Sequence, residues 1–340
     1  MKYKFLSNTG VLVSELCFGT MTFGGDGYWE AIGRLQQDEG SALVKTALDS
    51  GINFFDTANV YSYGKSEIIL GQAIKDLGVK RSDVVIATKA RGRMAAGANQ
   101  IGLSRLHIMD SVNESLERLG TDHIDLFYIH GVDAETALEE TMRGLEDIVR
   151  SGKVRYLGVS NHAAWQIMKA NGIAEKNGWT KFVACQHYYT IAGRDIEREL
   201  VPMMKDQNLA LMPWSPLAGG FLSGKYTRNN ATSGDNRRDS FDFPPIDKEK
   251  AYDIIDVIQP IAEAHSVSVA QIALSWLLHQ QSVTSVIIGA KKPEQLKDNI
   301  AATSVVLTPE DLDKLNKISE LNSEYPAWMF ARQGRDRVPE

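Results

Sequence analysis

Three short apolar stretches decide the fold: Gly51–Asp56 (GINFFD), Val84–Lys89 (VVIATK) and Ile124–His130 (IDLFYIH). Each runs through hydrophobic residues and stops on an ionisable side chain, and Tyr61 follows the first stretch by five residues. A strand that ends in this way directs its last side chain to one rim of the sheet. Three such strands in succession predict a (β/α) barrel with its chemistry at the C-terminal ends of the strands.

Strand-like runs alternate with amphipathic stretches along the whole chain. The eight runs are Leu16–Phe18, Asn53–Phe55, Val84–Thr88, Ile124–Ile129, Val154–Val159, Phe182–Cys185, Leu209–Pro213 and Ser285–Ile288. Between them, Ser104–Leu119 and Glu135–Ser151 carry apolar residues at helical spacing, and Thr308-Pro309 begins a further helix. The alternation implies a parallel sheet, and eight units favour a closed barrel over an open doubly wound sheet. We predict an α/β fold, a (β/α)8 TIM barrel.

The length suits one such domain. The chain has 340 residues, and a (β/α)8 barrel takes roughly 250, which leaves room for long loops and extra C-terminal helices. We predict a single domain over 1–340, in which residues 1–13 form a hairpin that plugs the bottom of the barrel and residues 322–340 form a tail. Ser223–Asp247 is a long polar segment, of a kind that is usually functional or disordered.

Composition argues against several classes of partner and site. The net charge is −6 and no basic stripe occurs, so we expect neither nucleic-acid nor membrane binding. No apolar run approaches a membrane span and the N-terminus lacks a signal-peptide core, so the expected compartment is the cytoplasm. Cys17 and Cys185 are expected to be buried thiols, and without CxxC, HxH or HExxH spacing no metal site is predicted.

The four reactive groups together suit acid/base chemistry. A tyrosine alone has a pKa of about 10, but a nearby ammonium favours the phenolate. Lys89 is the candidate for that ammonium, Asp56 can hold it charged, and His130 can hydrogen-bond a substrate oxygen. Such a centre suits protonation of a carbonyl oxygen as hydride arrives at carbon, and the hydride must come from a cofactor because no side chain can donate it.

Each of the four residues also has a plainer reading. Asp56 could cap a helix, Tyr61 could be a surface aromatic, Lys89 could be a solvated strand end and His130 could be a core histidine. It is improbable that all four residues occur together by chance, because all four fall at the same end of consecutive predicted strands.

These residues carry a resemblance to the aldo-keto reductase family. The stretch 51–71 (GINFFDTANVYSYGKSEIILG) resembles the first signature of the family, and IATKA and DLFYIH match the strands that end on the Lys and His of its catalytic tetrad. Residues 154–161 (VRYLGVSN), 213–226 (PWSPLAGGFLSGKY) and 287–299 (IIGAKKPEQLKDN) resemble its cofactor-binding segments. The similarity spans nearly the whole chain, and it looks closest to the branch with potassium-channel β subunits and many bacterial reductases.

The resemblance implies a carbonyl reductase that uses NADP(H), with NAD(H) as the alternative. By position, Tyr61 would be the general acid, Lys89 and Asp56 would tune it, and His130 would orient the carbonyl. Further along the chain, four groups of residues would contact the cofactor: they would hold the nicotinamide carboxamide, stack on the nicotinamide ring, surround the pyrophosphate and contact the adenosine end. In that order the residues are Ser160, Asn161 and Gln186; Trp214; Ser215, Leu217, Gly219, Leu222, Ser223, Gly224 and Lys225; and Gly289, Lys291, Gln295, Asp298 and Asn299.

Two parts of the implied cofactor site have alternatives. Gln295 stands where many family members place an arginine, so Lys291 is the main candidate for a 2′-phosphate, with Arg228 or Arg237 as other options. Residues 218–247 would close over the cofactor as a strap. The plainer readings are a core tryptophan for Trp214, turn-forming glycines and a solvated Lys291-Lys292 pair.

The substrate site is expected in the loops after the strands. A partly apolar pocket would suit a small carbonyl compound, and the insertion Gly24–Gln37 would narrow it. The apolar candidates, for which loop packing is the plainer reading, are Met21, Phe23, Trp29, Trp328 and Phe330.

Other enzyme classes fit poorly. GGFLSGKY at 219–226 nearly matches a phosphate-binding loop but ends on Tyr226 where a hydroxyl for Mg²⁺ is needed, and GVSNH at 158–162 has His162 in place of the second glycine of a nucleophile elbow. No GxGxxG exists for a Rossmann fold. The expected function is reversible reduction of an aldehyde or ketone to an alcohol, and the alternative is a cofactor-binding redox sensor or regulatory subunit with little turnover.

Overall fold

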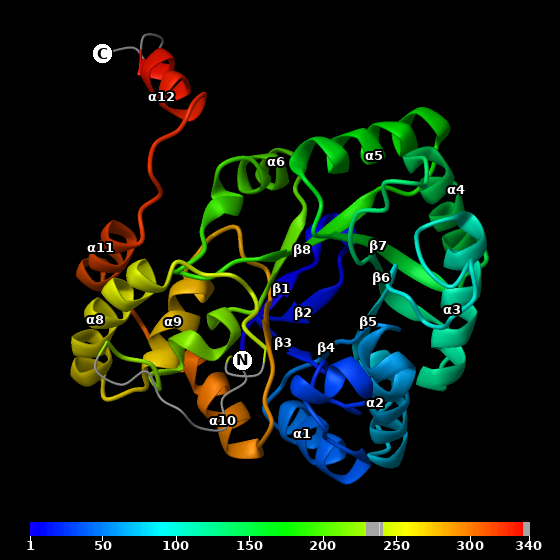
Figure 1. Ribbon diagram of the computed structural model, residues 1–340, viewed down its shortest axis with the longest axis horizontal. Helices are drawn as coiled ribbons and strands as arrows, with labels where there is room; N and C mark the ends of the chain where they lie inside the picture. Colours follow the sequence, from blue (N-terminus) through cyan, green and yellow to red (C-terminus); the bar gives the residue numbers. More distant parts are fainter. Residues whose placement is uncertain (229–237, 239–240, 336–340) are drawn as a thin grey trace.

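Eight parallel strands form the predicted barrel (Figure 1). This computed structural model describes residues 1–228, 238 and 241–335. The strands are β3 (Leu16–Gly19), β4 (Phe54–Asp56), β5 (Val85–Ala90), β6 (Ile124–Ile129), β7 (Val154–Ser160), β8 (Phe182–Tyr188), β9 (Ala210–Trp214) and β10 (Val286–Ile288). Their order is β10-β3-β4-β5-β6-β7-β8-β9. The amides of Thr284 and Ser285 donate to the carbonyl of Leu211 at 2.9 and 3.3 Å, and these bonds draw β9 toward β10 to close the ring.

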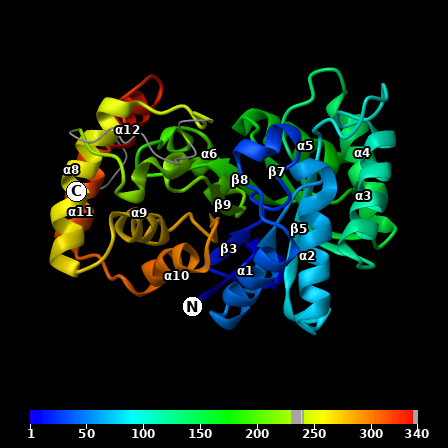
Figure 2. The same cartoon turned by 60° about the horizontal axis from the view of Figure 1, so that its bottom comes forward.

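Helices surround the strands on the outside, except for α12, which stands apart from the barrel. They are α1 (Gln37–Asp49), α2 (Lys65–Asp76), α3 (Arg105–Leu119), α4 (Leu138–Arg150), α5 (Ala164–Asn177), α6 (Leu200–Asp206), α8 (Lys248–His265), α9 (Val269–Leu278), α10 (Pro293–Ala301), α11 (Pro309–Ile318) and α12 (Ala327–Arg335). Figure 2 shows α3 and α4 on one flank, with α8 and α11 packed together on the other.

Local sequence sets the helix ends. The Ser104 hydroxyl accepts from the amide of His107 at the start of α3, and Gly120 ends that helix in the left-handed region at φ 63°. Thr308 and Asp311 form a capping box around Pro309 at the start of α11. The predicted helices at these places are therefore confirmed, within a few residues at each boundary.

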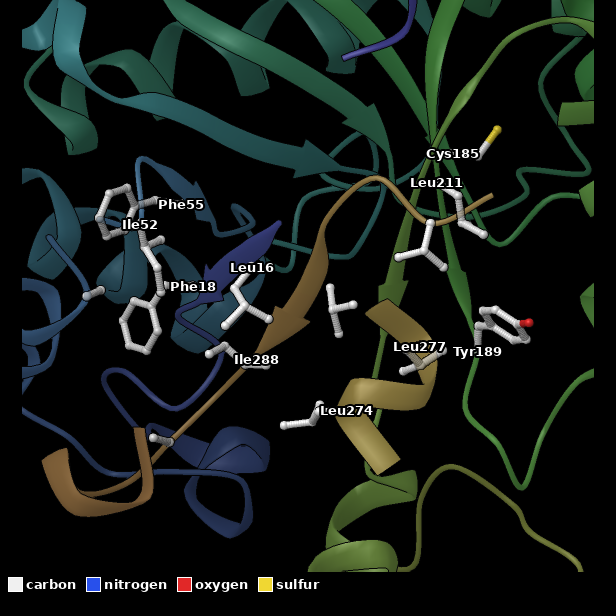
Figure 3. Packing of buried hydrophobic residues seen from close by; sticks show 14 of the residues in the cluster. Leu16, Phe18, Ile52, Phe55, Cys185, Tyr189, Leu211, Leu274, Leu277 and Ile288 are labelled. Atoms are coloured by element: carbon white, nitrogen blue, oxygen red, sulfur yellow. The ribbon is translucent and has the colours of Figure 1, made fainter. Parts of the chain in front are cut away.

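Two layers of apolar packing hold the barrel together. Between strands and helices lies the larger layer, in which Phe18, Phe55, Leu211 and Leu274 are fully buried (Figure 3). Inside the strands lies a smaller layer that includes Cys17. This division follows from strand geometry, because successive side chains point to opposite faces. Both cysteines are buried, as predicted.

The N-terminal hairpin covers one end of the barrel interior. Strands β1 (Tyr3–Phe5) and β2 (Leu12–Ser14) pair antiparallel, and Leu6 and Val13 are fully buried in the same cluster as the inward-facing strand residues. Figure 1 shows the hairpin across the centre of the ring. The predicted plug is confirmed, and it leaves the opposite rim, where the strands end, available for chemistry.

The C-terminal tail extends away from the barrel. Helix α12 is joined to α11 through extended chain and stands apart from the strands in Figure 1. Arg198 holds the connection through the carbonyl of Asn322 at 3.0 Å and through Glu324 at 3.2 Å. Among the described helices, none alone has the length and apolar character to cross a membrane, and α8 and α9 meet those criteria only as a pair bent by 96°.

Candidate active site

Lys89 is the hub of the candidate site. Its side chain is fully buried near the end of β5, and its ammonium donates to Asp56 Oδ1 at 2.5 Å, to the Thr57 carbonyl at 2.7 Å and to Tyr61 Oη at 3.3 Å. Burial opposes the charge, but Asp56 and Tyr61 outweigh it and raise the pKa of Lys89. A lysine in this setting stays protonated at neutral pH, so a cation is fixed beside the phenol oxygen.

Asp56 joins the acid/base centre to the next part of the rim. Burial raises the pKa of this carboxyl, and the contacts with Lys89 and Gln186 offset part of that rise. Its second oxygen accepts from Gln186 Nε2 at 2.8 Å, across the barrel from β8. Gln186, predicted from resemblance as a cofactor contact, therefore lies directly against the predicted catalytic residues.

A tight turn presents Tyr61. Ser62 and Tyr63 adopt left-handed φ values of 48° and 51°, and Gly64 follows at 96°. The Ser62 hydroxyl donates to the carbonyl of Phe23 and accepts from the amide of Gly25, both at 2.8 Å. The turn is thus tied to the start of the 24–37 insertion, and these bonds support a conformation that would otherwise be strained. The Tyr61 side chain is only 8% exposed.

His130 is held as a neutral imidazole beside the phenol. Its ring lies edge-on to Tyr61, with centroids 5.7 Å apart. Burial, together with the charges of Lys89 and Arg91, lowers the pKa of His130 to about 3. At neutral pH it carries one ring N–H, which can donate a hydrogen bond to a carbonyl oxygen without contributing charge.

The next strand ends continue the site. Asn161 Nδ2 donates to the carbonyl of His130 at 2.9 Å, and Asn161 Oδ1 accepts from Trp214 Nε1 at 3.0 Å. Among the described residues, the buried hydroxyl of Ser160 is one of seven buried side-chain polar atoms without a hydrogen-bond partner. Since buried polar atoms are usually paired, this free hydroxyl at the end of β7 is compatible with the predicted ligand contact. Ser160 and Asn161 thus offer both hydrogen-bond donors and acceptors to the nicotinamide carboxamide that they are predicted to hold.

The proposed pyrophosphate cradle has little room for side chains. At Gly219, φ is 66°, and an added Cβ would lie 2.6 Å from the carbonyl oxygen of Phe243. The amide of Gly219 donates to Ser215 Oγ at 2.9 Å, so the backbone here is folded by its own hydroxyl. Leu217 begins the turn, while Leu222, Ser223, Gly224 and the exposed Lys225 complete it. The space beside Gly219 is therefore filled by Phe243, Pro244 and Arg238, and glycine keeps this turn tightly packed.

The predicted adenosine end lies beside β10. Lys291 is exposed and makes no ion pair within the described chain, whereas its amide donates to Gln295 Oε1 at 3.0 Å. Asp298 accepts from Ser268 Oγ at 3.0 Å and Gln271 Nε2 at 2.6 Å, and Asn299 donates to the carbonyl of Gly289 at 3.3 Å. Lys291 is thus the available cation here, and the predicted adenine contacts also brace α9 and β10.

Arg228 and Arg237 were the other candidates for binding the 2′-phosphate. Arg228 is engaged with three carboxylates on α8, those of Glu249, Asp253 and Asp256, so it is already neutralised. Arg237 lies outside the described residues. Arg238, which the sequence did not single out, is buried and donates to the carbonyls of Ala218 at 2.8 Å and Pro244 at 3.0 Å. It ties residues 241–244 to the cradle.

A row of aromatic side chains crosses the mouth of the site. Trp29 lies edge-on to Tyr61 at 5.2 Å, and Tyr28 packs on Phe241 at 5.6 Å. Phe243 stacks flat on Trp214 at 5.8 Å. The row joins the 24–37 insertion to the end of the strap, so both predicted loops do border the site. Phe241 and Phe243 were missed, because a loop aromatic has no periodic signal in sequence.

Three predicted substrate contacts have other surroundings in this structure, and their role stays a prediction. Phe23 is fully buried against Phe18, because its position directly after β3 turns it into the core. Trp328 and Phe330 lie 47% and 64% exposed on α12, away from the barrel, since the tail extends outward. Trp29 does face Tyr61. Met21 is half-buried, and nothing in its surroundings decides its role.

A hollow of about 360 Å³ opens beside His130 and Asn161. Arg91, Gly92, Gly131 and Val132 complete its lining. Arg91 was not singled out from sequence, although its place two residues after Lys89 was a usable signal. In the part of the chain that the structure describes, no cluster of His, Cys, Asp or Glu is arranged to hold a metal ion.

Comparison with known proteins agrees with this geometry. The model of the Aldo/keto reductase family matches residues 15–320. The chain belongs to the aldo/keto reductase family. It is 37% identical to the versiconal hemiacetal acetate reductase of Aspergillus parasiticus, over 93% of this chain and 96% of that protein. The uncharacterized oxidoreductase YrpG of Bacillus subtilis is 39% identical, over 94% and 96%. A probable voltage-gated potassium channel subunit beta of Oryza sativa subsp. japonica is 37% identical, over 94% and 96%. This aldo/keto reductase is therefore an oxidoreductase of the family.

Proposed function

We propose that the protein reduces an aldehyde or ketone to an alcohol with NADP(H), reversibly, with Tyr61 as the general acid. The observation that carries this proposal is the contact of Lys89 with both Asp56 and Tyr61 in a buried setting. A fixed ammonium next to a phenol favours loss of the phenol proton, which is the property that a proton donor needs.

The proton route runs through residues of this chain alone. The Tyr61 hydroxyl gives its proton to the carbonyl oxygen, and Lys89 stabilises the phenolate that remains. Neutral His130 donates a hydrogen bond to the same oxygen and so helps to position it. Asp56 keeps Lys89 charged and aligned through the 2.5 Å contact. In the oxidative direction Tyr61 acts as the base, so alcohol oxidation gains with rising pH.

The cofactor site is proposed for the second half of the rim. When bound, NADP(H) supplies the hydride that no side chain can provide. The partnerless Ser160 hydroxyl and the exposed Asn161 side chain support a carboxamide contact there. The glycine-containing turn at 218–224 supports an approach of phosphates to its backbone, and Lys291, which makes no ion pair in the described chain, supports a 2′-phosphate. NAD(H) would lack that phosphate and forgo this contact.

A different class of function competes with this one. Three of the relatives are named as probable or putative potassium channel β subunits, which motivates a cofactor-binding sensor with little turnover. Others are named as a reductase or putative aryl-alcohol dehydrogenases, which favours turnover of small or aromatic carbonyls. The buried acid/base centre supports the enzyme, because a phenol held beside an ammonium is suited to proton transfer.

One assay separates the two functions. NADPH oxidation is followed with a broad panel of aliphatic and aromatic aldehydes and ketones, and NADPH and NADH affinities are measured in parallel. We expect turnover with several carbonyls and tighter binding of NADPH than of NADH. Tight NADPH binding with negligible turnover across the whole panel would establish the sensor instead.

A further inference from the structure

Arg91 is a cation at the mouth of the site that the proposed chemistry does not use. Strand pairing sets Ala90 opposite Ile129, and the amide of His130 donates to the carbonyl of Ala90 at 3.0 Å. Arg91 therefore lies next to His130 at the end of neighbouring strands. Both residues line the same hollow of about 360 Å³, together with Asn161.

The Arg91 side chain is held in place. Its Nε donates to the carbonyl of Val132 at 3.0 Å, and its own carbonyl accepts from the amide of Gly102 at 2.9 Å. The next residue, Gly92, lies so close to Val60 that an added Cβ would be 2.7 Å from a Val60 methyl carbon. Because Val60 precedes Tyr61, the chain that carries Arg91 packs against the loop of the proposed proton donor, while the exposed guanidinium is held by its Nε bond to Val132. Because the Arg91 side chain is already held by this bond, binding a ligand would cost less of its conformational entropy.

The guanidinium has no carboxylate partner in the described chain. Elsewhere in the barrel arginines meet acids, as in the pairs Arg105–Asp147 and Arg118–Glu67. Asp133, the residue after Val132, is engaged by the amide of Leu103 and the hydroxyl of Thr136. With Nε occupied, the two terminal nitrogens of Arg91 remain to donate, in a chain whose net charge is −6.

We propose that Arg91 binds a carboxylate on the substrate, so that the protein prefers aldehydes or ketones with a carboxylate a few bonds from the reacting carbonyl. This inference rests on the proposed function. The terminal nitrogens of a guanidinium offer two parallel N–H donors, which match the two oxygens of a carboxylate. Neutral His130 receives the carbonyl end and Arg91 the charged end, so the hollow would orient the substrate between them.

The first test compares two substrates that differ only in charge. The ratio of kcat/KM for 4-carboxybenzaldehyde and its methyl ester is measured in the wild type and in Arg91→Gln. We expect the wild type to favour the acid, and the variant to lose about tenfold on the acid, through KM, with little change on the ester. Arg91→Lys, which keeps the charge, should recover part of the loss.

The control is Arg155→Gln. Arg155 is an exposed arginine at the start of β7 whose only hydrogen bond to the described residues is to the carbonyl of Gly152, so the ratio should not change. An equal loss on acid and ester in Arg91→Gln would mean that Arg91 merely braces the loop. A wild-type enzyme without preference for the acid would also overturn the proposal.

A second test needs no turnover. Calorimetry measures the binding of benzoate and of benzamide to the wild type and to Arg91→Gln, each with NADP⁺ present. We expect benzoate to bind the wild type more tightly than benzamide, and Arg91→Gln to abolish that difference. Equal binding of the two probes to the wild type contradicts the carboxylate site. Absence of carbonyl turnover contradicts the proposed function and leaves this binding result to decide on Arg91 alone.

Discussion

The two halves of the rim differ in how complete they are. From β4 to β6, the buried charged groups satisfy one another: Lys89 has three acceptors and Asp56 receives two donors. From β7 onward, the Ser160 hydroxyl is buried without a partner and Lys291 is exposed without an ion pair in the described chain. The charged groups proposed for proton transfer are thus paired within the protein alone, and on that side only the neutral Asn59 Oδ1 and Tyr128 Oη lack a hydrogen-bond partner among the described residues. The half proposed for the cofactor keeps an unused hydroxyl and an unused ammonium.

Electrostatics explains the difference. A buried ion pair is tolerated only when geometry and hydrogen bonds compensate the loss of water, so Asp56 and Lys89 must be complete before any ligand arrives. A neutral hydroxyl such as that of Ser160 carries a far smaller penalty when unpaired, and an exposed lysine carries none. The following predictions test this contrast, from the largest expected effect to the smallest.

Removing the phenol oxygen should affect rate alone. In Tyr61→Phe we expect a loss of about 10²–10⁴-fold in kcat for carbonyl reduction, which is the usual contribution of a general acid. The Kd for NADPH, measured by fluorescence titration, should stay close to wild type. Tyr63→Phe, at the exposed neighbouring tyrosine, is the matched control and should retain full activity. A nearly full rate in Tyr61→Phe would refute the assigned proton donor.

Breaking the buried ion pair should cost stability as well as rate. Lys89→Met leaves Asp56 buried without its cation, so the free energy of unfolding at pH 7 should fall by about 3–5 kcal/mol. Urea denaturation measures this loss. The double variant Asp56→Asn/Lys89→Met should lose less than the sum of the single variants, because the orphaned charge is gone. Additive losses would show that the two residues act independently.

Lowering the pH should reduce the stability loss of Lys89→Met. Burial raises the pKa of Asp56 already in the wild type, so protonation of this carboxyl favours the folded state. Without the Lys89 cation that tendency should strengthen. The stability gap between Lys89→Met and wild type should therefore narrow as the pH is lowered from 7 to 5, and a constant gap would contradict this account.

Removing the unpaired Ser160 hydroxyl should weaken cofactor binding and leave stability unchanged. In Ser160→Ala we expect the Kd for NADPH to rise roughly three- to tenfold, while the free energy of unfolding stays within about 0.5 kcal/mol, because no protein hydrogen bond is lost. Ser275→Ala is the counterpart: its hydroxyl donates to the carbonyl of Val305 at 3.0 Å. That variant should lose about 1 kcal/mol of stability with unchanged NADPH affinity. A Ser160→Ala variant that loses stability but keeps cofactor affinity would reverse our assignment.

The smallest effect concerns His130 and pH. Since its pKa is lowered to about 3, the unfolded chain binds a proton near pH 6.5 that the folded protein refuses. Stability should fall as the pH drops from about 6.5 toward 3, by at most about 1.4 kcal/mol per unit and by less where solvent screens the charge. His130→Gln should flatten this slope in urea denaturation at pH 7 and 5. In the wild type, kcat should show no step near pH 6.5, and such a step would mean that His130 titrates in the working enzyme.

Sequence predicted the barrel because its signals are local. The eight apolar runs each became a strand within two or three residues at either boundary, and Ser104 and Thr308 capped helices as expected. Asp56, Lys89 and His130 met because parallel strands that end together bring their last residues together. The cofactor assignments depended on resemblance, and for them the structure supplies compatible surroundings rather than a test.

Loop and tail residues are where local sequence is least informative. Phe23, Trp328 and Phe330 were predicted for the pocket as apolar residues in loops or a tail, and nothing local distinguishes a loop aromatic that faces the core from one that faces a ligand. Arg91 and Phe243 were overlooked for the same reason. Their importance comes from neighbours that are far away along the chain.

The sequence by itself determined the order of strands and helices, the ionisable residue at the end of each early strand and the family to which the chain belongs. Only the tertiary structure decided which groups are satisfied within the described residues: Lys89 has three acceptors, the Ser160 hydroxyl has no partner, and Arg91 lies beside His130 without an acid. Periodicity and capping are encoded within a few residues. Hydrogen-bond pairing and charge compensation depend on distances between segments far apart in the chain, and those exist only once the barrel has closed.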